Sequence, residues 1–519
     1  MSVLRHDEVR DLLTLHPDSS TEAIPRDLSE VFAAETFRSI AGTTVERLAE
    51  HLSDDTVRGL DLTDPDRLIA LARSLMTTER NVVAPLDEER LSAILDLYVR
   101  TGIQVHSAGA MGRQFSGTVP LAGVVELVGA VTNQPSSFYE AAQLPSVAER
   151  IMAEELNRFV GWEPGTFAMV TTSGGSLANL TALAAARNKR FPRFWAEGSA
   201  GSAGSASGRR PAVAVGDDVH YSVTRAVGIL GIGEDQVVRL PLNPARQISV
   251  ELAGPALDAA AARGLDVFCL VATAGTTSVG AFDPLEDLAD LAAARDLWLH
   301  VDAAHGGGLL VSDEYRHLLQ GVRRVDSIAL DAHKMMFVPA PCTLLFYRDA
   351  QDSRRPFRQD ASYVFDEEPD IYTRLDSGDR NFECTKRPMI MALWVLWAVH
   401  GPAVFARKVD HLCRVTLAAH DVVVGEPDFA VMHRPEANIL CFRYLPPGLP
   451  ETAVHRLQVA IRNRVKEHGT FFLSKVDLDG TAALRVVMMN HRTTTDHFRQ
   501  LLTEIREVAA NLLAQPYAT

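Results

Sequence analysis

One segment decides the fold, Pro284-Leu-Glu-Asp-Leu-Ala-Asp-Leu-Ala-Ala-Ala-Arg-Asp-Leu-Trp-Leu-His-Val-Asp302. Its leucines at 285, 288 and 291 recur at helical spacing, which predicts an amphipathic helix. The apolar run after it, Leu297–Asp302, predicts a buried strand. Similar short apolar runs alternate with helical stretches along the middle of the chain, at residues 167–171, 212–215, 267–273, 327–331 and 343–347. This alternation predicts right-handed βαβ crossovers and an α/β fold whose largely parallel sheet is covered by helices on both faces.

The segments on either side predict two further parts. Residues 1–100 contain amphipathic helical stretches and no group that suggests chemistry. Residues 101–385 form the predicted large α/β domain, interrupted by a Gly/Ser/Ala-rich segment at 198–208 to which no function is assigned. Residues 386–519 combine helical and strand-like runs, which predicts a smaller C-terminal α+β domain.

The composition excludes several classes of protein. The chain has 519 residues, 47% of them hydrophobic, and 51 basic against 66 acidic side chains give a net charge of −15. This is typical of a soluble enzyme, and the acidic balance argues against nucleic acid or an anionic membrane as a partner. The charged N-terminus does not resemble a signal peptide, and the longest apolar run, 389–399, is too short to span a bilayer. Five scattered cysteines without CxxC spacing favour core thiols over disulfides or a metal site, and we expect a cytoplasmic protein.

Candidate site residues follow the predicted strands, because ligands of parallel sheets bind beyond the carboxyl ends of the strands. The first is Ser173-Gly174-Gly175, between a strand and a helix. Two glycines let the backbone approach a ligand, and the free amides of a first helical turn can bind a phosphate. A tight strand-to-helix turn explains the same glycines about as well.

Three more strand ends have an acid, an amine and an imidazole. Asp302 ends a buried strand, where a carboxylate is costly unless a cation pairs with it, although an Asp that caps the next helix is the commoner case. Lys334 follows another strand, where a dry environment would favour the neutral amine that a Schiff base requires; the alternative is a surface lysine. His220 could stack on an aromatic ring or could cap a helix.

Together these four groups indicate a cofactor that none indicates alone. A phosphate-binding turn, a stackable His, a buried Asp and an amine, at 173, 220, 302 and 334, are the parts that pyridoxal 5'-phosphate needs.

The chain resembles the group II pyridoxal-phosphate-dependent amino-acid decarboxylases of fold-type I, and among them the glutamate and cysteine-sulfinate decarboxylases. The resemblance extends from about residue 100 to the end. Seven motifs occur in the right order: Thr172-Ser-Gly-Gly-Ser-Leu-Ala-Asn179, His220-Tyr-Ser-Val-Thr-Arg-Ala226, Ala272-Thr-Ala-Gly-Thr-Thr277, His300-Val-Asp-Ala-Ala304, His333-Lys-Met-Met-Phe-Val-Pro-Ala-Pro-Cys342, Ala361-Ser-Tyr-Val-Phe365 and Asp376-Ser-Gly-Asp-Arg-Asn-Phe-Glu-Cys384.

This resemblance implies a mainly parallel seven-stranded sheet and specific roles. Lys334 would hold the cofactor aldehyde, Asp302 the pyridine nitrogen and His220 the ring face. The residues near the phosphate, the ring or the lysine would be Ser173, Gly174, Gly175, Thr273 and His333. Tyr363 matches the tyrosine of a loop that, in relatives, closes over the neighbouring subunit's site and protonates the product carbon, so a homodimer with the active site at its interface is expected. Arg485 matches the arginine that holds a substrate carboxylate.

The chain departs from the family in two places. The segment that lines the substrate pocket in relatives, here His106–Thr118, lacks the usual proline and paired phenylalanines. Its polar residues Arg113, Gln114 and Ser116 are candidates for binding a substrate side chain, or could equally face solvent. Before His333-Lys334, Asp331-Ala332 replaces the usual Asn-Pro.

The leading hypothesis is an L-amino-acid α-decarboxylase that acts on a short polar substrate, acidic ones first, such as glutamate, aspartate or cysteine sulfinate. Alternatives are a decarboxylase of L-2,4-diaminobutyrate or of an aromatic amino acid, and a carbon–carbon lyase or decarboxylation-coupled oxidase on the same scaffold. Tyr363 argues against the oxidase, because that proton donor protects the carbanion from oxygen. A non-catalytic module that keeps only the fold is a further alternative.

Overall fold

The computed structural model describes residues 26–77, 83–198, 208–357 and 373–514. The chain divides into two compact units, Met1–Val57 with Asp61–Gly102, and Arg58–Leu60 with Ile103–Thr519. The predicted boundary after residue 385 lies inside the second unit.

The first unit is helical in its described part. It contains α2 (Arg26–Val31), α3 (Ala34–Ser53), α4 (Pro65–Ser74) and α5 (Glu88–Arg100). Asp64 and Asp87 cap α4 and α5 by accepting backbone N–H groups of the first turn. The two-residue strands β1 (Leu60–Asp61) and β2 (Gly102–Ile103) mark where the chain passes between the units.

The second unit is built on a seven-stranded sheet, which confirms the predicted fold class. Its strands, in the order β3-β9-β8-β7-β6-β4-β5, are β3 (Ala168–Thr172), β4 (Arg210–Gly216), β5 (Val237–Leu240), β6 (Leu265–Thr273), β7 (Trp298–Asp302), β8 (Ser327–Asp331) and β9 (Thr343–Tyr347). Strand β9 runs in the direction opposite to the other six, so both of its pairings, with β3 and with β8, are antiparallel. Six strands coincide with the predicted apolar runs. The unpredicted β5 has four residues, one of them the exposed Arg239.

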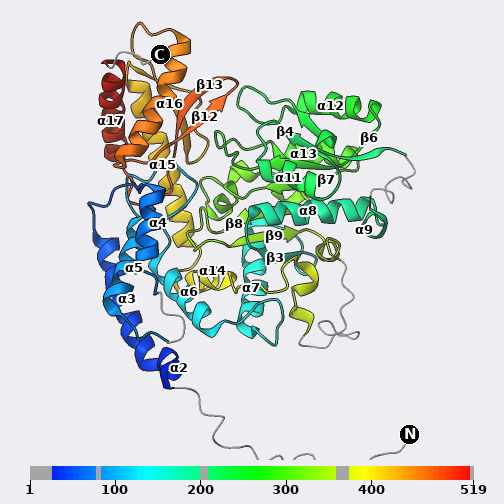
Figure 1. The fold of residues 1–519 in the computed structure, drawn as a ribbon. Coiled ribbons are helices and arrows are strands. Elements are labelled where there is room, and N and C mark those ends of the chain that lie inside the picture. Colours follow the sequence, from blue (N-terminus) through cyan, green and yellow to red (C-terminus); the bar gives the residue numbers. More distant parts are fainter. Residues whose placement is uncertain (1–25, 78–82, 199–207, 358–372, 515–519) are drawn as a thin grey trace, which may run out of the picture. The chain divides into compact units, whose positions relative to one another are not determined.

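Helices cover both faces of this sheet because its strands are apolar on both sides. Residues Val213 and Val215 of β4 pack with α8 (Gly175–Arg190) and α11 (Tyr221–Ile229) in one core. Ala212 and Ala214 of the same strand belong to the opposite core, with α7 (Gln143–Val160), α12 (Val250–Ala262), α13 (Leu285–Ala294) and α14 (Ile390–His400). In Figure 1, α8 lies beside β8 and β9, with which it is in contact. The alternation along one strand thus anchors two helical layers.

A second sheet gives the C-terminal part its own core. Its antiparallel strands, in the order β10-β11-β13-β12, are β10 (Phe429–Val431), β11 (Ile439–Tyr444), β12 (Ser474–Leu478) and β13 (Thr481–Val487). Buried side chains of these strands pack with α15 (Ala403–Gly425), α16 (Glu451–His468) and α17 (Thr495–Ala514). The remaining elements are α6 (Pro120–Thr132), α9 (Phe194–Glu197) and the 3-10 helices η1 (Glu234–Gln236), η2 (Gly306–Val311), η3 (Arg316–Leu319), η4 (Val322–Arg324), η5 (Ala350–Arg354), η6 (Thr373–Leu375) and η7 (Gly378–Arg380).

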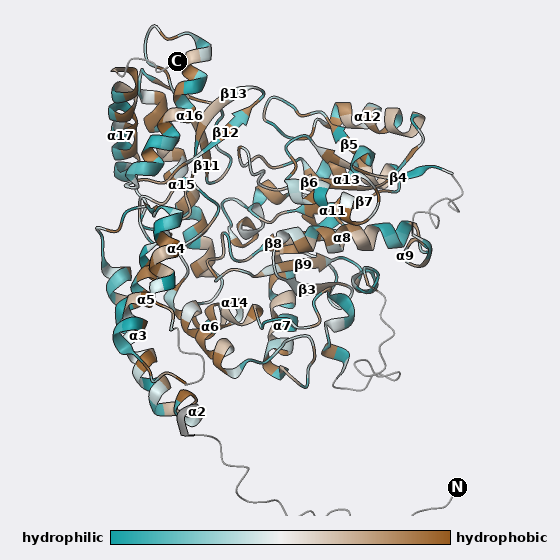
Figure 2. Ribbon diagram, in the orientation of Figure 1, coloured by the Kyte–Doolittle hydropathy of each residue, from teal (hydrophilic) through white to brown (hydrophobic). Residues whose placement is uncertain are grey.

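Within the described ranges, no single helix combines the length and the apolar character that a membrane span requires. Only α14 and α15 taken together pass such a test, and they are bent by 98°. Figure 2 shows α14 as one of the most hydrophobic helices. Its Ile390, Leu393 and Leu396 are buried in the core of the large sheet, which accounts for that composition.

Close packing between η2 and β8 leaves no room for a side chain at Gly307. A Cβ atom there would lie 2.7 Å from Cγ of Leu330. We expect Gly307→Ala to lower the free energy of unfolding by about 1–3 kcal/mol, because overpacking forces the core apart. The matched change Gly228→Ala, at an exposed position of α11 where an added Cβ would have no atom within 4 Å, should be neutral or stabilise by about 0.5–1 kcal/mol. Thermal unfolding of both variants checks this, and equal melting temperatures would contradict it.

Candidate active site

A cavity of about 430 Å³ lies where β3, β4, β6, β7 and β8 end. All eight residues predicted to bind the cofactor line it: Ser173, Gly174, Gly175, His220, Thr273, Asp302, His333 and Lys334. They come from five separate segments of the chain. Parallel strands therefore bring together groups that are up to 161 residues apart in sequence, as expected for this class of sheet.

The glycine turn opens α8 toward this cavity. Gly174 has φ +146° and ψ 158°, a conformation that glycine adopts without strain. At Gly175, the first residue of α8, a Cβ atom would lie 3.1 Å from Oδ1 of Asp331. The N–H groups of a first helical turn have no acceptor within the helix, so they are free to bind an anion.

Asp302 accepts hydrogen bonds from its neighbours but has no cationic partner among the described residues. Its Oδ2 accepts a hydrogen bond from Nδ2 of Asn179 at 2.8 Å, and its Oδ1 accepts one from the Ala304 amide at 3.1 Å. The side chain is 4% exposed, and it forms no ion pair with a lysine, arginine or histidine in the part of the chain that the structure describes. A cationic group beside a buried carboxylate of this kind would offset its desolvation cost.

A chain of hydrogen bonds fixes the orientation of Asn179. The indole N–H of Trp298 donates to Oγ of Ser327, so the Ser327 hydroxyl is free to donate to Nδ1 of His300, each at 2.8 Å. His300 then carries its proton on Nε2, 2.9 Å from Oδ1 of Asn179. Burial lowers the pKa of His300 to about 4, which keeps the imidazole neutral. The amide of Asn179 must therefore present its NH₂ group to Asp302.

The same amide also connects to His220, the cap of α11. Nδ2 of Asn179 donates to Oγ of Ser222 at 3.0 Å, and this hydroxyl lies 2.8 Å from Nδ1 of His220. Nδ1 also accepts the Ser222 amide at 3.3 Å. His220 is thus a helix cap, as the alternative interpretation predicted, and it also lines the cavity. Burial lowers its pKa, partly offset by the nearby Asp302 charge, which favours a neutral imidazole.

Lys334 was predicted to lie in a dry site that favours the neutral amine, but its side chain is 20% exposed and has an acidic partner. Its Nζ lies 3.0 Å from Oδ2 of Asp331, a buried acid that also accepts the Thr343 hydroxyl at 2.5 Å. His333 lies 3.5 Å from the same carboxylate oxygen. The acid that replaces the usual asparagine therefore attracts the lysine ammonium and sets the direction of its side chain.

The predicted substrate-binding residues lie outside the lining of this cavity. Arg485, on β13, is buried; its Nε donates to the Ser278 carbonyl at 3.1 Å, one residue after the cavity-lining Thr277. Nη2 of Arg485, Nε2 of Gln114 and Oγ of Ser116 are buried without a hydrogen-bond partner among the described residues. Arg113 is exposed and Tyr363 lies outside the described residues.

Comparisons with known proteins agree with this geometry. Residues 86–445 match the model of the pyridoxal-dependent decarboxylase conserved domain. The chain belongs to this family. It is 30% identical to the cysteine sulfinic acid decarboxylase of Rattus norvegicus, over 82% of this chain and 86% of the relative. It is also 30% identical to the aromatic-L-amino-acid decarboxylase of Bacillus atrophaeus, over 65% and 68%. The fold matches the crystal structure of mouse CSAD with a TM-score of 0.82, at 24% identity, over 91% of this chain and 99% of that one.

This decarboxylase is a pyridoxal-phosphate-dependent carboxy-lyase that acts on amino acids, and its cavity fits the cofactor. The buried, cation-free Asp302 fits a protonated pyridine nitrogen. The start of α8 fits a phosphate, and Lys334 supplies the amine for the aldehyde. Asn179, His300 and Asp331 support these groups, although their roles were not predicted. Asn179 and His300 were visible only as members of their motifs.

We expect the buried neutral histidines to make the stability of this enzyme sensitive to acid. Burial lowers the pKa of His305, which lines the cavity, to about 3, whereas an unfolded histidine titrates near 6.5. Below pH 6.5 the unfolded chain takes up a proton that the folded chain resists, so this contribution to stability is lost as the pH falls from about 6.5 toward 3. The loss approaches about 1.4 kcal/mol per pH unit.

We expect His305→Gln, which keeps a donor for Asn438, to reduce the slope of unfolding free energy against pH by about 1 kcal/mol per unit below pH 6. Urea unfolding at several pH values measures this slope. The exposed His317→Gln is the control and should leave it unchanged. Identical slopes for wild type and His305→Gln would show that the buried imidazole does not resist protonation.

Proposed function

We propose that the enzyme decarboxylates a short acidic L-amino acid, of the glutamate, aspartate or cysteine-sulfinate type, to CO₂ and a primary amine. The observation that supports this most is the buried Arg485, whose Nη2 has no acceptor in the described structure. Its guanidinium is held from behind by Ser278 and by Oγ of Ser474 at 3.1 Å. An anionic oxygen would complete this environment.

The unpaired donors favour an acidic over an aromatic substrate. Gln114 and Ser116 also have buried polar atoms without partners. Buried donors without acceptors are costly, and a ligand rich in carboxylate or sulfinate oxygens would satisfy them whereas an aromatic ring would not. The two curated relatives differ in the substrate that their names state, so the choice depends on these groups.

Each cavity residue has a role in the proposed reaction. When bound, pyridoxal phosphate supplies an electron sink for the pair left by the broken Cα–carboxylate bond. Asp302, oriented by Asn179, would hold the proton on the pyridine nitrogen, and His220 would cover the ring. Lys334 would hold the aldehyde and release it to the substrate amine, with Asp331 receiving the freed ammonium 3.0 Å away. We propose Tyr363 as the acid that protonates Cα, as the family resemblance implies.

A product profile tests this proposal. Purified enzyme with added cofactor is given aspartate, glutamate, cysteine sulfinate, 2,4-diaminobutyrate, tyrosine and tryptophan, and amine, CO₂, aldehyde and peroxide are measured. We expect amine from an acidic substrate with a kcat/KM at least about 100-fold above the others, since unsatisfied buried donors penalise the wrong ligand strongly. An aromatic or diamino acid as best substrate would overturn the proposed specificity, and peroxide with aldehyde would indicate the oxidase.

Arg485→Lys in the same assay tests the carboxylate contact. We expect a raised KM and a kcat/KM lowered roughly 10- to 100-fold, because an ammonium cannot form the bidentate pair. The visible absorption of the lysine-bound cofactor should be unchanged. Arg499→Lys, at an exposed ion pair on α17, is the matched control.

We also propose that the enzyme is a homodimer. The exposed face of α6 supports this, since Val124, Leu127, Val128 and Val131 recur at helical spacing and are 40–59% exposed. Figure 2 shows α6 as a hydrophobic helix. A continuous apolar stripe on a helix surface is typical of a protein interface, and a second copy would bury it.

Light scattering after size-exclusion chromatography tests the dimer. We expect twice the chain mass for wild type and one chain mass for Val128→Asp, because a buried unpaired charge disrupts an apolar interface. Activity should fall with the dimer if Tyr363 acts in the neighbouring site. Val424→Asp, at an isolated exposed valine of α15, should remain dimeric. A monomeric wild type, or a Val128→Asp variant that stays dimeric, would refute this interface.

A further inference from the structure

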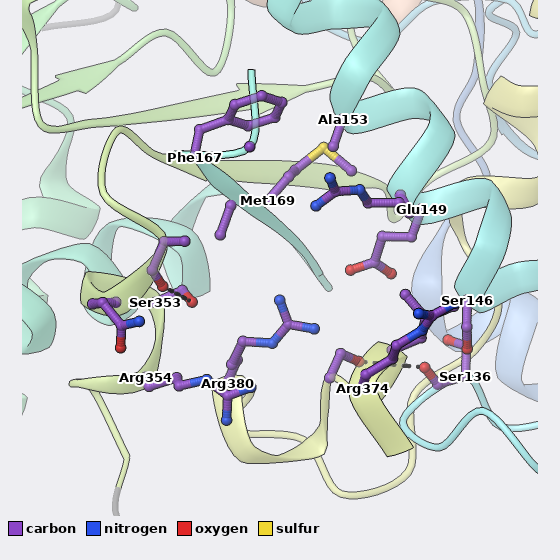
Figure 3. A pocket seen from close by; sticks show the side chains of 17 residues that line it. Ser136, Ser146, Glu149, Ala153, Phe167, Met169, Ser353, Arg354, Arg374 and Arg380 are labelled. Carbon is purple, nitrogen blue, oxygen red and sulfur yellow. Dashed lines mark hydrogen bonds between the residues drawn. The ribbon is translucent and has the colours of Figure 1, made fainter. Parts of the chain in front are cut away.

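We propose that a second cavity, separate from the active site, binds a phosphate group, either as inorganic phosphate or as part of a small phosphomonoester. It has a volume of about 280 Å³ and is lined by residues of α7, the start of β3, η5, η6 and η7. Figure 3 shows this cavity. It shares no lining residue with the cofactor cavity, and the glycine turn leaves β3 at the other end of that strand.

Arginines dominate the charge of this cavity. Arg150, Arg354, Arg374 and Arg380 line it, against one acid, Glu149. The chain as a whole has a net charge of −15, so four arginines around one cavity run against its overall composition. Guanidinium groups from four different elements surround the space, an arrangement that suits an anion with several oxygens.

Two of these cations already have acidic partners. Arg150 pairs with Glu154 one helical turn away, at 2.7 Å, and Arg354 pairs with Asp379. These contacts lie at the rim, where both arginines are about half exposed. They reduce the positive charge of the cavity but do not remove it.

Of the other two cations, Arg374 has no acidic partner among the described residues, and Arg380 has only a long ion pair with Asp379. Arg374 forms no ion pair or hydrogen bond with the residues that the structure describes. Arg380 donates Nη2 to the Asp376 carbonyl at 2.7 Å, but its buried Nε has no hydrogen-bond acceptor, and the nearest oxygen of Asp379 is 3.6 Å away. Figure 3 shows the Arg380 side chain reaching into the cavity. Burial lowers its pKa, and an anion there would offset that desolvation.

Glu149 stabilises the charge of Arg380 only in part, because its carboxylate also interacts with other groups. Its carboxylate accepts the Thr171 amide at 3.0 Å and the Thr171 hydroxyl at 2.9 Å, and it pairs with the fully buried Lys386 at 3.3 Å. Lys386 thus balances the one acid in the lining. The excess positive charge of Arg374 and Arg380 remains available to a ligand.

The donors that remain point to phosphate as the ligand class. The hydroxyls of Ser136, Ser146 and Ser353 already donate to backbone carbonyls, so the guanidinium groups must supply the binding energy. A phosphate dianion has enough oxygens and charge to engage Arg374 and Arg380 together, whereas a single carboxylate has two oxygens and one charge. A volume near the lower end for ligand pockets restricts the occupant to a small molecule.

Calorimetry on the cofactor-loaded enzyme tests this site, since the bound cofactor then occupies the phosphate position of the active site. Inorganic phosphate, glycerol 3-phosphate and succinate are titrated separately. We expect one site per chain for both phosphates, with weaker binding of succinate. Arg374→Gln should weaken phosphate binding roughly tenfold or more, the effect of one lost charge-assisted hydrogen bond.

Arg380→Gln should weaken phosphate binding by a similar factor. If this buried substitution prevents folding, Arg374→Gln still tests the site, because Arg374 is exposed and its replacement should not affect folding. Arg316→Gln, an exposed arginine paired with Asp313, is the control and should bind as wild type. No binding of either phosphate, an unchanged affinity in Arg374→Gln, or tighter binding of succinate would overturn the proposal. These results leave the proposed decarboxylation untouched, because no step of the assay depends on turnover.

Discussion

The active site depends on one chain of hydrogen bonds that begins at an indole and ends at a carboxylate. Trp298 can only donate, so each later group in the series has a single consistent role, through Ser327 and His300 to Asn179. The result is an amide whose NH₂ faces Asp302. Asp302 is buried and hydrogen-bonded and has no cationic partner among the described residues, so it would suit the protonated ring of the cofactor.

The sheet brings these groups together through register. Thr273 of β6 lies beside Asp302 of β7, so both face the same cavity. His300 of β7 lies beside Ser327 of β8, which lets their side chains form a hydrogen bond that continues to α8. The helix α8 then contributes both Asn179 and the glycine turn. One helix packed on one face of the sheet would therefore support both the phosphate and the ring nitrogen of the cofactor. Asp331, the last residue of β8, and Lys334, three residues later, also line this cavity.

The two cavities differ in the sign of the charged groups that are buried in or near them. In the active-site cavity the acids Asp302 and Asp331 are buried, and they suit a cationic ring and an amine. Arg485 near that cavity and Arg380 in the second one have buried donors without acceptors, and they suit anions. Buried charge in the first cavity, and buried donors without acceptors at Arg485 and Arg380, suggest the charge of the ligand, because burying charged or unpaired polar groups is costly.

The sequence by itself determined the fold class, the strands whose ends have polar or charged residues, and a set of predicted cofactor-binding residues that line one cavity. Periodicity and strand-end composition are local properties that need no knowledge of contacts. Only the tertiary structure decided what those residues touch. Lys334 was expected in a dry site, yet its Nζ lies 3.0 Å from Asp331. The sequence motif gave no role to Asn179, whose hydrogen bonds to His300 and Asp302 form only in the folded chain. The arginine cavity shows the same limit, since Arg150 and Arg380 are 230 residues apart in sequence. Their shared charge exists only after folding, because electrostatic interactions depend on distance in space and not along the chain.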